Sequence, residues 1–286
     1  MDLPVELPPL DIPALLRQHG LHPDKRLGQN FLIDHASIGK VIEAAGLQKQ
    51  DIILEIGAGL GNLTRHLAAR TRQVVAVELD DRLVPALRQV LEPFPNVRIV
   101  QGDILSLSTS DLFHPPLDGG YLVVANIPYY ITSALIRHLL ESSPPPQRIC
   151  LTVQVEVAER ICANPGDLSL LALSVQVYGS PRIAARIPAG AFYPPPKVDS
   201  AVVRVDLYPQ PVIPTHQLDG FFRLTKAGFG QKRKTLRNAL VNGLHQPASQ
   251  IESLLHTAGI DPRRRAETLS LAEWKTLVEV GSSKAG

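Results

Sequence analysis

Residues 51–61 read Asp-Ile-Ile-Leu-Glu-Ile-Gly-Ala-Gly-Leu-Gly, a short apolar run that leads into a glycine-rich turn. The nearly continuous apolar character of residues 51–56 is typical of a strand that is buried on both faces of a sheet. Three alternating glycines let the backbone approach a ligand closely at the start of the following helix. Their spacing is G-x-G-x-G, which differs from the G-x-G-x-x-G of dinucleotide-binding folds. The stretch therefore predicts a strand, a turn and a helix with a ligand site at the turn.

On both sides of this stretch, helical and extended apolar patterns alternate. We expect strands over residues 73–78, 97–100 and 121–125, and helices over residues 36–47, 60–69, 81–91 and 133–140. Three later strands, near residues 148–153, 182–187 and 201–207, are expected at the far edge of the same sheet. Because strands that alternate with helices are joined by right-handed crossovers, the predicted fold class is α/β, with a doubly wound, mainly parallel, Rossmann-like sheet.

The chain divides into three predicted segments. A Pro/Leu-rich extension spans residues 1–24, the sheet domain spans residues 25–208, and a smaller all-helical C-terminal domain follows a proline-rich stretch and spans residues 209–286. The formal charge of the 286 residues is only +2, but residues 211–286 hold 11 Lys and Arg against 6 Asp and Glu. A basic C-terminal segment is what binding to a polyanion would require.

The composition excludes several classes of protein. Hydrophobic residues make up 44% of the chain and charged residues 20%, so a sizeable core can form and wholesale disorder is excluded. Cys150 and Cys162 are too few for a disulfide scaffold and lack metal-ligand spacing, so we expect no metal. The N-terminus lacks a signal-peptide pattern, and no apolar run approaches the roughly 20 residues of a membrane span. We therefore expect a cytoplasmic protein without a membrane partner, with a monomer as the default.

Acidic side chains follow the next two predicted strands. A carboxylate at Glu78 can accept hydrogen bonds from both hydroxyls of a ribose, and one at Asp103 can accept a hydrogen bond from an adenine amino group. With Gly57 and Gly59, these residues lie along the carboxyl edge of the sheet, where ligands bind in such folds. An acidic pocket without a Walker lysine disfavours a phosphate-rich ligand. It favours S-adenosylmethionine, which has no phosphate and carries a cationic sulfonium.

The fourth predicted strand ends in Asn126-Ile127-Pro128-Tyr129. An adenine N6 amine is a poor nucleophile because its lone pair is delocalised into the ring. The side-chain oxygen of Asn126 and the carbonyl of Ile127 can accept hydrogen bonds from that amine and draw its nitrogen toward tetrahedral geometry. Pro128 fixes the backbone so that both oxygens point one way, and Tyr129 can stack on the base. Positioning then supplies most of the catalysis, without a metal or a strong base.

Eight stretches of the chain match, in order, the motifs of one known family. They are KRLGQNFL (25–32), EIGAGLGNLT (55–64), VELD (77–80), GDIL (102–105), ANIPYYITS (125–133), QVEVAERI (154–161), FYPPPKVDSAVVR (192–204) and FGQKRKTLRNAL (229–240). On these motifs the chain resembles the ribosomal small-subunit adenine dimethyltransferases, the KsgA/RsmA family, over roughly residues 22–245. The last two stretches are much more specific than the methyltransferase core motifs.

The resemblance implies an S-adenosylmethionine-dependent methyltransferase of ribosome biogenesis that transfers methyl groups to N6 of two adjacent adenosines and dimethylates each. It places these adenosines in the 3′-terminal hairpin loop of 16S rRNA, within an immature small ribosomal subunit. It implies cofactor contacts at Asn30, Leu32, Gly57, Glu78, Asp103 and Asn126, and it assigns Phe192 to the face of the target base opposite Tyr129. The departures are Ile127, where many relatives have Leu, Val155, where Lys is common, and the lack of a basic insert at residues 164–169. The last two concern the details of RNA contact, not the reaction.

Basic residues in two regions form the predicted RNA-binding footprint. They are Lys25, Arg26, Lys232, Arg233, Lys234 and Arg237. Phosphate contacts should dominate the affinity and make it strongly salt-dependent. Three consecutive arginines at 263–265 form a second cluster, for which a solvated helix face is an equally good interpretation.

Other functions stay open at this point. A large-subunit rRNA adenine methyltransferase of the macrolide-resistance type shares the core motifs, although residues 192–200 and 229–240 favour the small-subunit enzyme. A non-catalytic RNA-binding assembly factor would keep the fold without the reaction, but the intact Asn126, Pro128 and Tyr129 argue against it. A NAD-dependent oxidoreductase is a weak third alternative, because the glycine spacing does not fit it.

Overall fold

The structure is a computed structural model that describes residues 7–113 and 120–283. These residues form two compact units. The first contains the described residues up to Ala158 together with Arg182–Leu207, and the second contains Glu159–Pro181 and the described residues from Tyr208 onward. The chain leaves the first unit for the last time between Leu207 and Tyr208, which agrees within one residue with the domain boundary predicted after residue 208. Residues 159–181 differ from the prediction, because they cluster with the C-terminal helices and not with the sheet.

A seven-stranded sheet of order β4-β3-β2-β5-β6-β9-β7 forms the centre of the first unit. Its strands are β2 (Ile52–Ile56), β3 (Gln73–Glu78), β4 (Val97–Gln101), β5 (Leu122–Asn126), β6 (Arg148–Gln154), β7 (Gly179–Ile187) and β9 (Ser200–Leu207). The strands from β4 to β6 pair in parallel, whereas β9 runs antiparallel to β6. The predicted doubly wound, mainly parallel sheet is therefore confirmed. Strand order reverses between β2 and β5, and open α/β sheets bind ligands at such a switch point.

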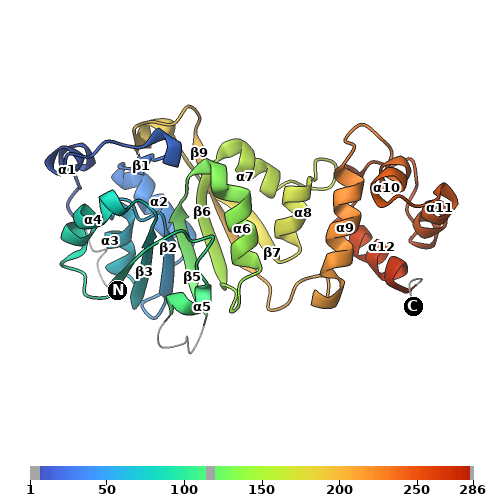
Figure 1. Cartoon of the computed structure of the whole chain (residues 1–286), viewed down its shortest axis with the longest axis horizontal. Coiled ribbons are helices and arrows are strands. Elements are labelled where there is room, and N and C mark those ends of the chain that lie inside the picture. The colour runs from blue at the N-terminus through green and yellow to red at the C-terminus, as the bar shows by residue number, and fades with distance from the viewer. Residues whose placement is uncertain (1–6, 114–119, 284–286) are drawn as a thin grey trace. The chain divides into compact units, whose positions relative to one another are not determined.

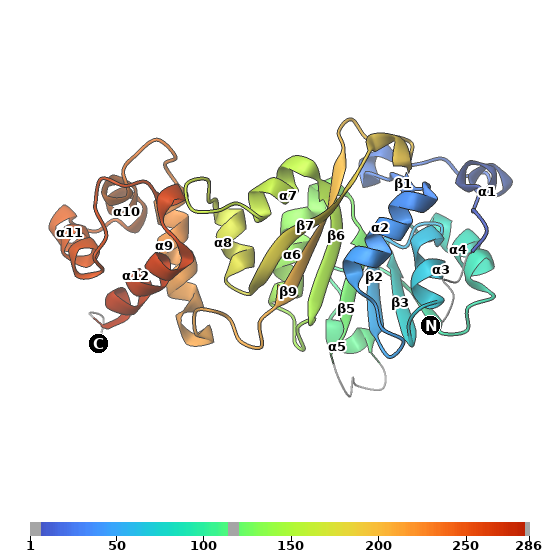
Figure 2. The same ribbon diagram turned by 180° about the vertical axis from the view of Figure 1, so that it is seen from behind.

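Helices cover both faces of this sheet. On one face lie α2 (His35–Ala45) and α3 (Asn62–Ala68), as Figure 2 shows, and α4 (Val84–Leu91) packs against α3. On the opposite face lies α6 (Thr132–Leu140), which is in front of the sheet in Figure 1. Apolar side chains from both layers form the core between α2, α3 and the strands, and Val41, Leu67 and Val74 within it are 0% exposed.

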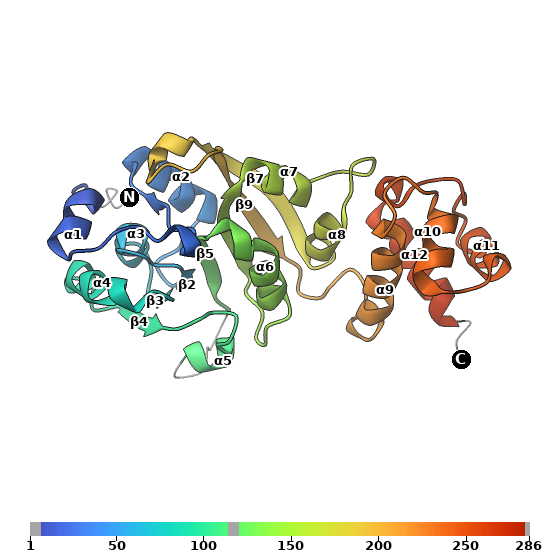
Figure 3. The ribbon, with the colours of Figure 1, turned by 45° about the horizontal axis from the view of Figure 1, so that its top comes forward.

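The first unit also contains shorter elements, and the helix that follows β6 continues past Ala158 into the second unit. The helices are α1 (Ile12–Gln18), α5 (Thr109–Leu112) and α7 (Val155–Ile161), and β1 (Phe31–Leu32) pairs with β8 (Phe192–Tyr193) in a separate two-stranded ribbon. Short 3-10 turns are η1 (Lys25–Leu27), η2 (Asp81–Leu83), η3 (Tyr129–Ile131) and η4 (Ala189–Ala191). Figures 1 and 3 show α1 beside α4.

The described part of the second unit is helical apart from the start of β7. It contains α8 (Leu170–Gln176), η5 (Thr215–Gln217), α9 (Leu218–Phe229), α10 (Leu236–Leu244), α11 (Ala248–Thr257), η6 (Ala266–Thr268) and α12 (Leu271–Ser283). In Figure 3 the helices α9 to α12 gather into one bundle, in which α12 packs against both α9 and α11. Leu173 of α8 is 0% exposed in the same core as Phe221 and Trp274, which explains why residues 159–181 belong to this unit. None of the helices in residues 7–113 and 120–283 has the length and apolar composition that a membrane crossing needs.

Candidate active site

The turn between β2 and α3 forms the base of the site. Gly57, Gly59 and Gly61 have φ values of 74°, 59° and 83°, which lie in the left-handed region that glycine adopts without strain. The amides of Gly57 and Ala58 donate to the Val77 carbonyl on β3 at 2.9 and 3.2 Å, so the turn is fixed to the neighbouring strand. The alternating glycines therefore form a rigid backbone turn at the start of α3, and the Phe31 ring packs closely against Gly59.

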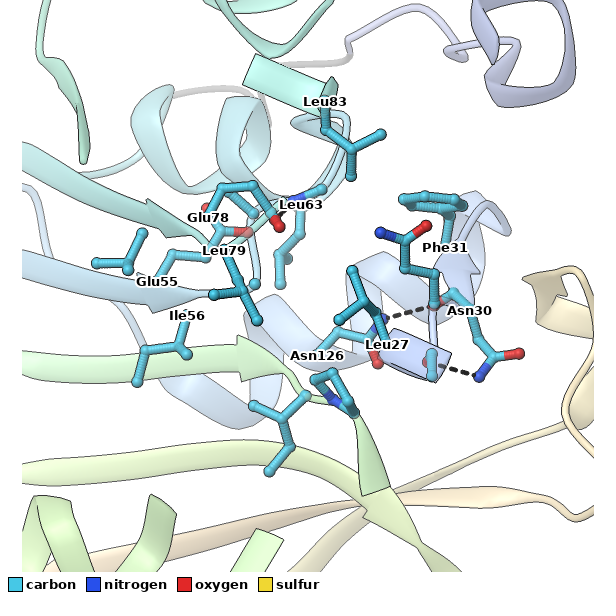
Figure 4. Close-up of a pocket in the computed structure, with 18 of the residues that line it drawn as sticks. Leu27, Asn30, Phe31, Glu55, Ile56, Leu63, Glu78, Leu79, Leu83 and Asn126 are labelled. Atoms are coloured by element: carbon cyan, nitrogen blue, oxygen red, sulfur yellow. Dashed lines mark hydrogen bonds between the residues drawn. The ribbon is translucent and has the colours of Figure 1, made fainter. Parts of the chain in front are cut away.

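A cavity of about 270 Å³ lies over this turn, at the switch point between β2 and β5. The structure brings all the predicted cofactor residues to its wall: Asn30, Leu32, Gly57, Gly59, Glu78, Asp103 and Asn126. Ile127, Pro128 and Tyr129 line the same cavity. Figure 4 shows Glu78 and Asn126 projecting toward one space from two strands of the sheet. The sequence motifs, which are up to about a hundred residues apart, thus form one site.

Glu78 is a preorganised acceptor at the end of β3. The residue is 6% exposed, and its carboxylate oxygens accept hydrogen bonds from the Gly59 amide at 2.7 Å and from the Asp80 amide at 2.8 Å. Burial raises the pKa of Glu78, while these two amides oppose the rise by stabilising the charged form. The same carboxylate therefore faces the cavity and holds the glycine-rich turn.

Asn126 is held in one orientation by its neighbour across the cavity. Its Nδ2 donates to the Asn30 carbonyl at 3.0 Å, and the Asn30 side chain in turn donates to the Gly28 carbonyl at 3.0 Å. Both bonds are drawn in Figure 4. Because the amino end of the Asn126 amide is occupied, Oδ1 is the end that stays free to accept a hydrogen bond from a ligand.

Tyr129 is fixed at the far end of its ring. Its hydroxyl lies 2.8 Å from the Ser200 Oγ at the start of β9, and Ser200 is 0% exposed. Thr132 Oγ1 donates to the Tyr129 carbonyl at 3.0 Å, and Pro128 precedes the residue with φ at −59°. Burial raises the pKa of Tyr129, so the phenol stays neutral at physiological pH. The ring is therefore held in one place beside Asn126.

Phe192 differs from its predicted position. It is 2% exposed, packs in the core with Leu32 and does not line the cavity, so it presents no free face to a base in this structure. Register explains the difference, because Phe31 pairs with Tyr193 and Leu32 pairs with Phe192, and successive side chains of a strand point to opposite sides. Tyr193, the next residue, takes the exposed position at 37%.

Other wall residues were not predicted from the sequence, and Leu79 and Ile12 are two of them. Leu79 lines the cavity and is 47% exposed, and its signal was available, since it directly follows Glu78 at the strand end. Ile12 lines the cavity from α1, although the sequence pattern gave the N-terminal extension no role. Within residues 7–113 and 120–283, no group of three or more His, Cys, Asp or Glu side chains is arranged to hold a metal ion.

The predicted RNA-binding residues fall on two surfaces, one on each unit. Lys25 and Arg26 are exposed on η1, where Arg26 pairs with Asp24 at 3.0 Å. Lys232, Arg233 and Lys234 are exposed on the segment between α9 and α10.

Arg237, like Arg26, has an acidic partner. Its Nε lies 2.5 Å from a carboxylate oxygen of Glu252, so any phosphate has to compete with that ion pair.

A groove of about 420 Å³ runs between α9 and α10 and adds two cations to this surface. Arg223 and Lys226 line it together with Gln231 and Asn242, whose side chains are joined by a hydrogen bond of 3.1 Å. Neither cation was predicted from the sequence, although their three-residue spacing on one helix was a usable signal.

The arginines at 263–265 have acidic neighbours instead. Arg263 pairs with Asp261 at 3.2 Å, Arg264 with Glu273, and Arg265 with Glu267 at 3.7 Å. These ion pairs within the protein favour a structural role for the cluster.

This sheet order, with a nucleoside-type cavity over the glycine turn and an Asn-Ile-Pro-Tyr segment beside it, defines a Rossmann-like methyltransferase. Solved structures with the same fold agree. The chain is 26% identical to a dimethyladenosine transferase from Plasmodium falciparum, with a TM-score of 0.75 over 89% of this chain and 98% of that one. It is 29% identical to the 23S rRNA methyltransferase ErmE, with a TM-score of 0.69 over 88% and 99% of the two chains.

The family follows from the sequence comparison. The family model described as ribosomal RNA adenine dimethylase matches residues 21–281, and the chain belongs to this family. It is 48% identical over 265 residues to the ribosomal RNA small subunit methyltransferase A of Dehalococcoides mccartyi strain CBDB1, which covers 92% of this chain and 90% of the relative. The protein of the same name from Pelotomaculum thermopropionicum is 43% identical, with 95% of each chain covered. The chain is therefore an rRNA adenine dimethyltransferase, and the predicted family is confirmed.

Proposed function

We propose that this enzyme transfers methyl groups from S-adenosylmethionine to N6 of two adjacent adenosines in the 3′-terminal hairpin loop of 16S rRNA, and that it dimethylates each. The substrate is the RNA within an immature small ribosomal subunit, and the enzyme acts as a monomer in the cytoplasm. The observation that carries the chemistry is the orientation of Asn126, whose Oδ1 is free at the cavity while its Nδ2 is occupied by Asn30.

The cavity fits the methyl donor. Glu78 offers carboxylate oxygens to a ribose at the end of β3, and Leu79 and Ile104 provide apolar surface for an adenine ring next to Asp103. The glycine-rich turn leaves room for part of the ligand to pass close to the protein backbone. When bound, S-adenosylmethionine supplies an electrophilic methyl group on a cationic sulfonium. A cavity wall with Glu78 and Asp103 and without a lysine or arginine suits a ligand with a positive charge and no phosphate.

Asn126 and Ile127 activate the nucleophile. The Asn126 Oδ1 and the Ile127 carbonyl accept hydrogen bonds from the N6 amine of the target base, and both strengthen as the nitrogen gains positive charge. Because Asn30 already holds the amide in place, no reorganisation is needed when the reaction occurs. The amine proton leaves after the nitrogen becomes cationic, so a strong general base is not required.

Tyr129 orients the base. Its ring, fixed by Ser200 at the hydroxyl, provides a flat surface on which a purine stacks with its amino group directed at Asn126. The target adenosine has to leave its loop stack to reach this position, which costs little for an unpaired loop base. Binding geometry thus supplies the selectivity for adenine.

Basic residues of both units hold the RNA. Lys25, Lys232, Arg233 and Lys234 are exposed, and we assign them, with Arg26, Arg237, Arg223 and Lys226, to contacts with phosphates. Such contacts position the RNA without reading its sequence.

The small subunit is favoured over the large subunit as the target. Curated relatives at 43% to 48% identity are small-subunit enzymes, whereas the large-subunit enzyme ErmE is 29% identical. The stretches FYPPPKVDS and FGQKRKTLRNAL support the same assignment.

The test is the mapping of the methylated positions. Purified enzyme and labelled S-adenosylmethionine are incubated separately with small and large ribosomal particles that lack the modification, and the RNA is read by mass spectrometry and primer extension. We expect two adjacent dimethyladenosines near the 3′ end of the small-subunit RNA. Label that appears only in the large-subunit RNA would refute the target. No incorporation into either RNA would favour a role in binding alone.

A further inference from the structure

The first helix of the chain contributes to the cavity, although it lies outside the region that the family model matches. That region starts at residue 21, whereas α1 spans Ile12–Gln18. Ile12 lines the cavity and is 1% exposed. It belongs to one apolar cluster with Leu60, from the glycine-rich turn, and Leu83, from η2, and these two residues also line the cavity. The segment before the matched region thus completes an apolar side of the site.

The sequence of α1 accounts for its position. Ile12, Leu15 and Leu16 are spaced so that they share one face of the helix, and all three are buried in the same cluster. Asp11 Oδ1 accepts a hydrogen bond from the Ala14 amide at 2.9 Å and caps the first turn. The helix therefore has a defined start and a defined inner face, as expected of a fixed part of the fold.

Polar contacts hold the segment on both sides of α1. Before the helix, Arg65 of α3 donates to the Pro8 carbonyl. After it, the His19 ring nitrogen Nε2 lies 2.9 Å from the Gln89 Oε1 of α4. Further along, Gln29 Nε2 donates to Asp80 Oδ2 at 2.7 Å, two residues beyond Glu78. The anchors lie on α3, on α4 and directly after β3, so the segment is attached around the edge of the cavity.

We propose that α1 is part of the cofactor site and that Ile12 forms a wall against the adenosine portion of the methyl donor. The inference rests on the proposed function for the identity of the ligand. Adenine and ribose present flat, weakly polar faces, and a buried aliphatic side chain that clusters with Leu83, in a cavity that Glu78 also lines, excludes water from such faces. Residues before the matched family domain therefore help to set the affinity for S-adenosyl ligands.

A pair of matched variants tests the proposal. Ile12→Ala removes the wall, whereas Leu16→Ala removes a side chain of the same helix and cluster that is 3% exposed and does not line the cavity. Affinity for S-adenosylhomocysteine is measured by calorimetry on the full chain, and Tm is measured for each variant. We expect both substitutions to lower Tm, because each leaves a cavity in the core. Only Ile12→Ala should weaken binding, by roughly tenfold, or about 1.4 kcal/mol. Ile12→Val, which keeps the branched side chain, should stay within about twofold of the unsubstituted enzyme.

The outcomes separate this proposal from the proposed function. Unchanged affinity in Ile12→Ala, or an equal loss in both alanine variants, would overturn the role of Ile12 while leaving the methylated positions unaffected. Methylation of a different RNA would refute the target but not the wall, because binding of S-adenosylhomocysteine is measured without RNA. An unsubstituted enzyme that binds no S-adenosylhomocysteine would refute both.

Discussion

Replacing Asn126 with alanine removes the acceptor that we assign to the target amine. In the structure, its Nδ2 is engaged by the Asn30 carbonyl at 3.0 Å, so the substitution deletes one internal hydrogen bond and one free oxygen at the cavity. A preorganised hydrogen bond that strengthens in the transition state is worth about 2.7 to 4 kcal/mol, or roughly 10²- to 10³-fold in kcat. The internal bond between neutral groups is worth only about 1 kcal/mol. We therefore expect Asn126→Ala to lower kcat by roughly two to three orders of magnitude and to change cofactor affinity only a few-fold.

The assay is single-turnover transfer of a labelled methyl group to small subunits that lack the modification, at saturating cofactor. Asn30→Ala is the matched control, because it removes an amide of the same size from the same cavity but keeps the backbone carbonyl that holds Asn126. It should weaken cofactor binding more than it lowers kcat.

Asn126→Asp offers a second comparison. This substitution keeps the oxygen that accepts from the target amine. It also replaces the amino group, which donates to the Asn30 carbonyl at 3.0 Å, with a second oxygen that cannot donate, so it should recover only part of the rate. Full kcat in Asn126→Ala would refute the account of nucleophile activation.

Substitutions at four more places test other parts of the structure. Glu78→Gln should weaken S-adenosylhomocysteine binding by about tenfold or more in calorimetry, since it places an amino group near the Gly59 and Asp80 amides; an unchanged Kd would exclude Glu78 as a ligand contact. Tyr129→Phe should lower the free energy of unfolding by about 1 kcal/mol through loss of the Ser200 bond and keep most of kcat, whereas Tyr129→Ala should lose kcat as well; equal rates in the two variants would argue against stacking. Lys232→Ala with Lys234→Ala should flatten the salt dependence of RNA binding by about 1.4 to 1.8 in log–log slope, whereas Arg263→Ala, whose side chain pairs with Asp261, is the control that should leave the slope unchanged. Burial raises the pKa of Glu55 from 4.5 to about 8, so the folded state keeps a proton that the unfolded state loses, and stability should fall as pH rises from about 4.5 to about 8. Glu55→Gln should reduce that fall in denaturation curves recorded across the range, with a remainder because burial raises the pKa of Glu78 as well, and an unchanged pH dependence would contradict the assigned burial effect.

Local patterns were sufficient to predict the sheet and most of the site. The apolar run at residues 51–56 and the alternating glycines predicted β2 and the turn, since both depend on backbone conformation and burial that neighbouring residues determine. Strand ends carry side chains to one edge of a parallel sheet, so Glu78, Asp103 and Asn126 could be assigned to one cavity before the fold was seen.

Features that depend on distant partners could not be predicted in the same way. The pairing of β1 with β8 places Tyr193, and not Phe192, on the exposed side, and two-residue strands leave too weak a pattern to fix that register. The position of Ile12 depends on Leu60 and Leu83, about fifty and seventy residues further along the chain. Residues 159–181 carry an ordinary amphipathic pattern, and only their apolar partners Phe221 and Trp274 decide which unit they join.

The route of the chain between the two units matters for its synthesis. A ribosome releases residues 159–181 before α9 to α12 exist, and it releases β9, which lies between β6 and β7, later than both of those strands. The first unit cannot complete its sheet until translation has passed residue 207, so it matures later than an N-terminal domain that ended at Ala158 would, while residues 159–181 still wait for their partners in α9 to α12. A polypeptide that stopped at residue 207 would carry α8 with Leu173 uncovered, and we expect such a fragment to aggregate.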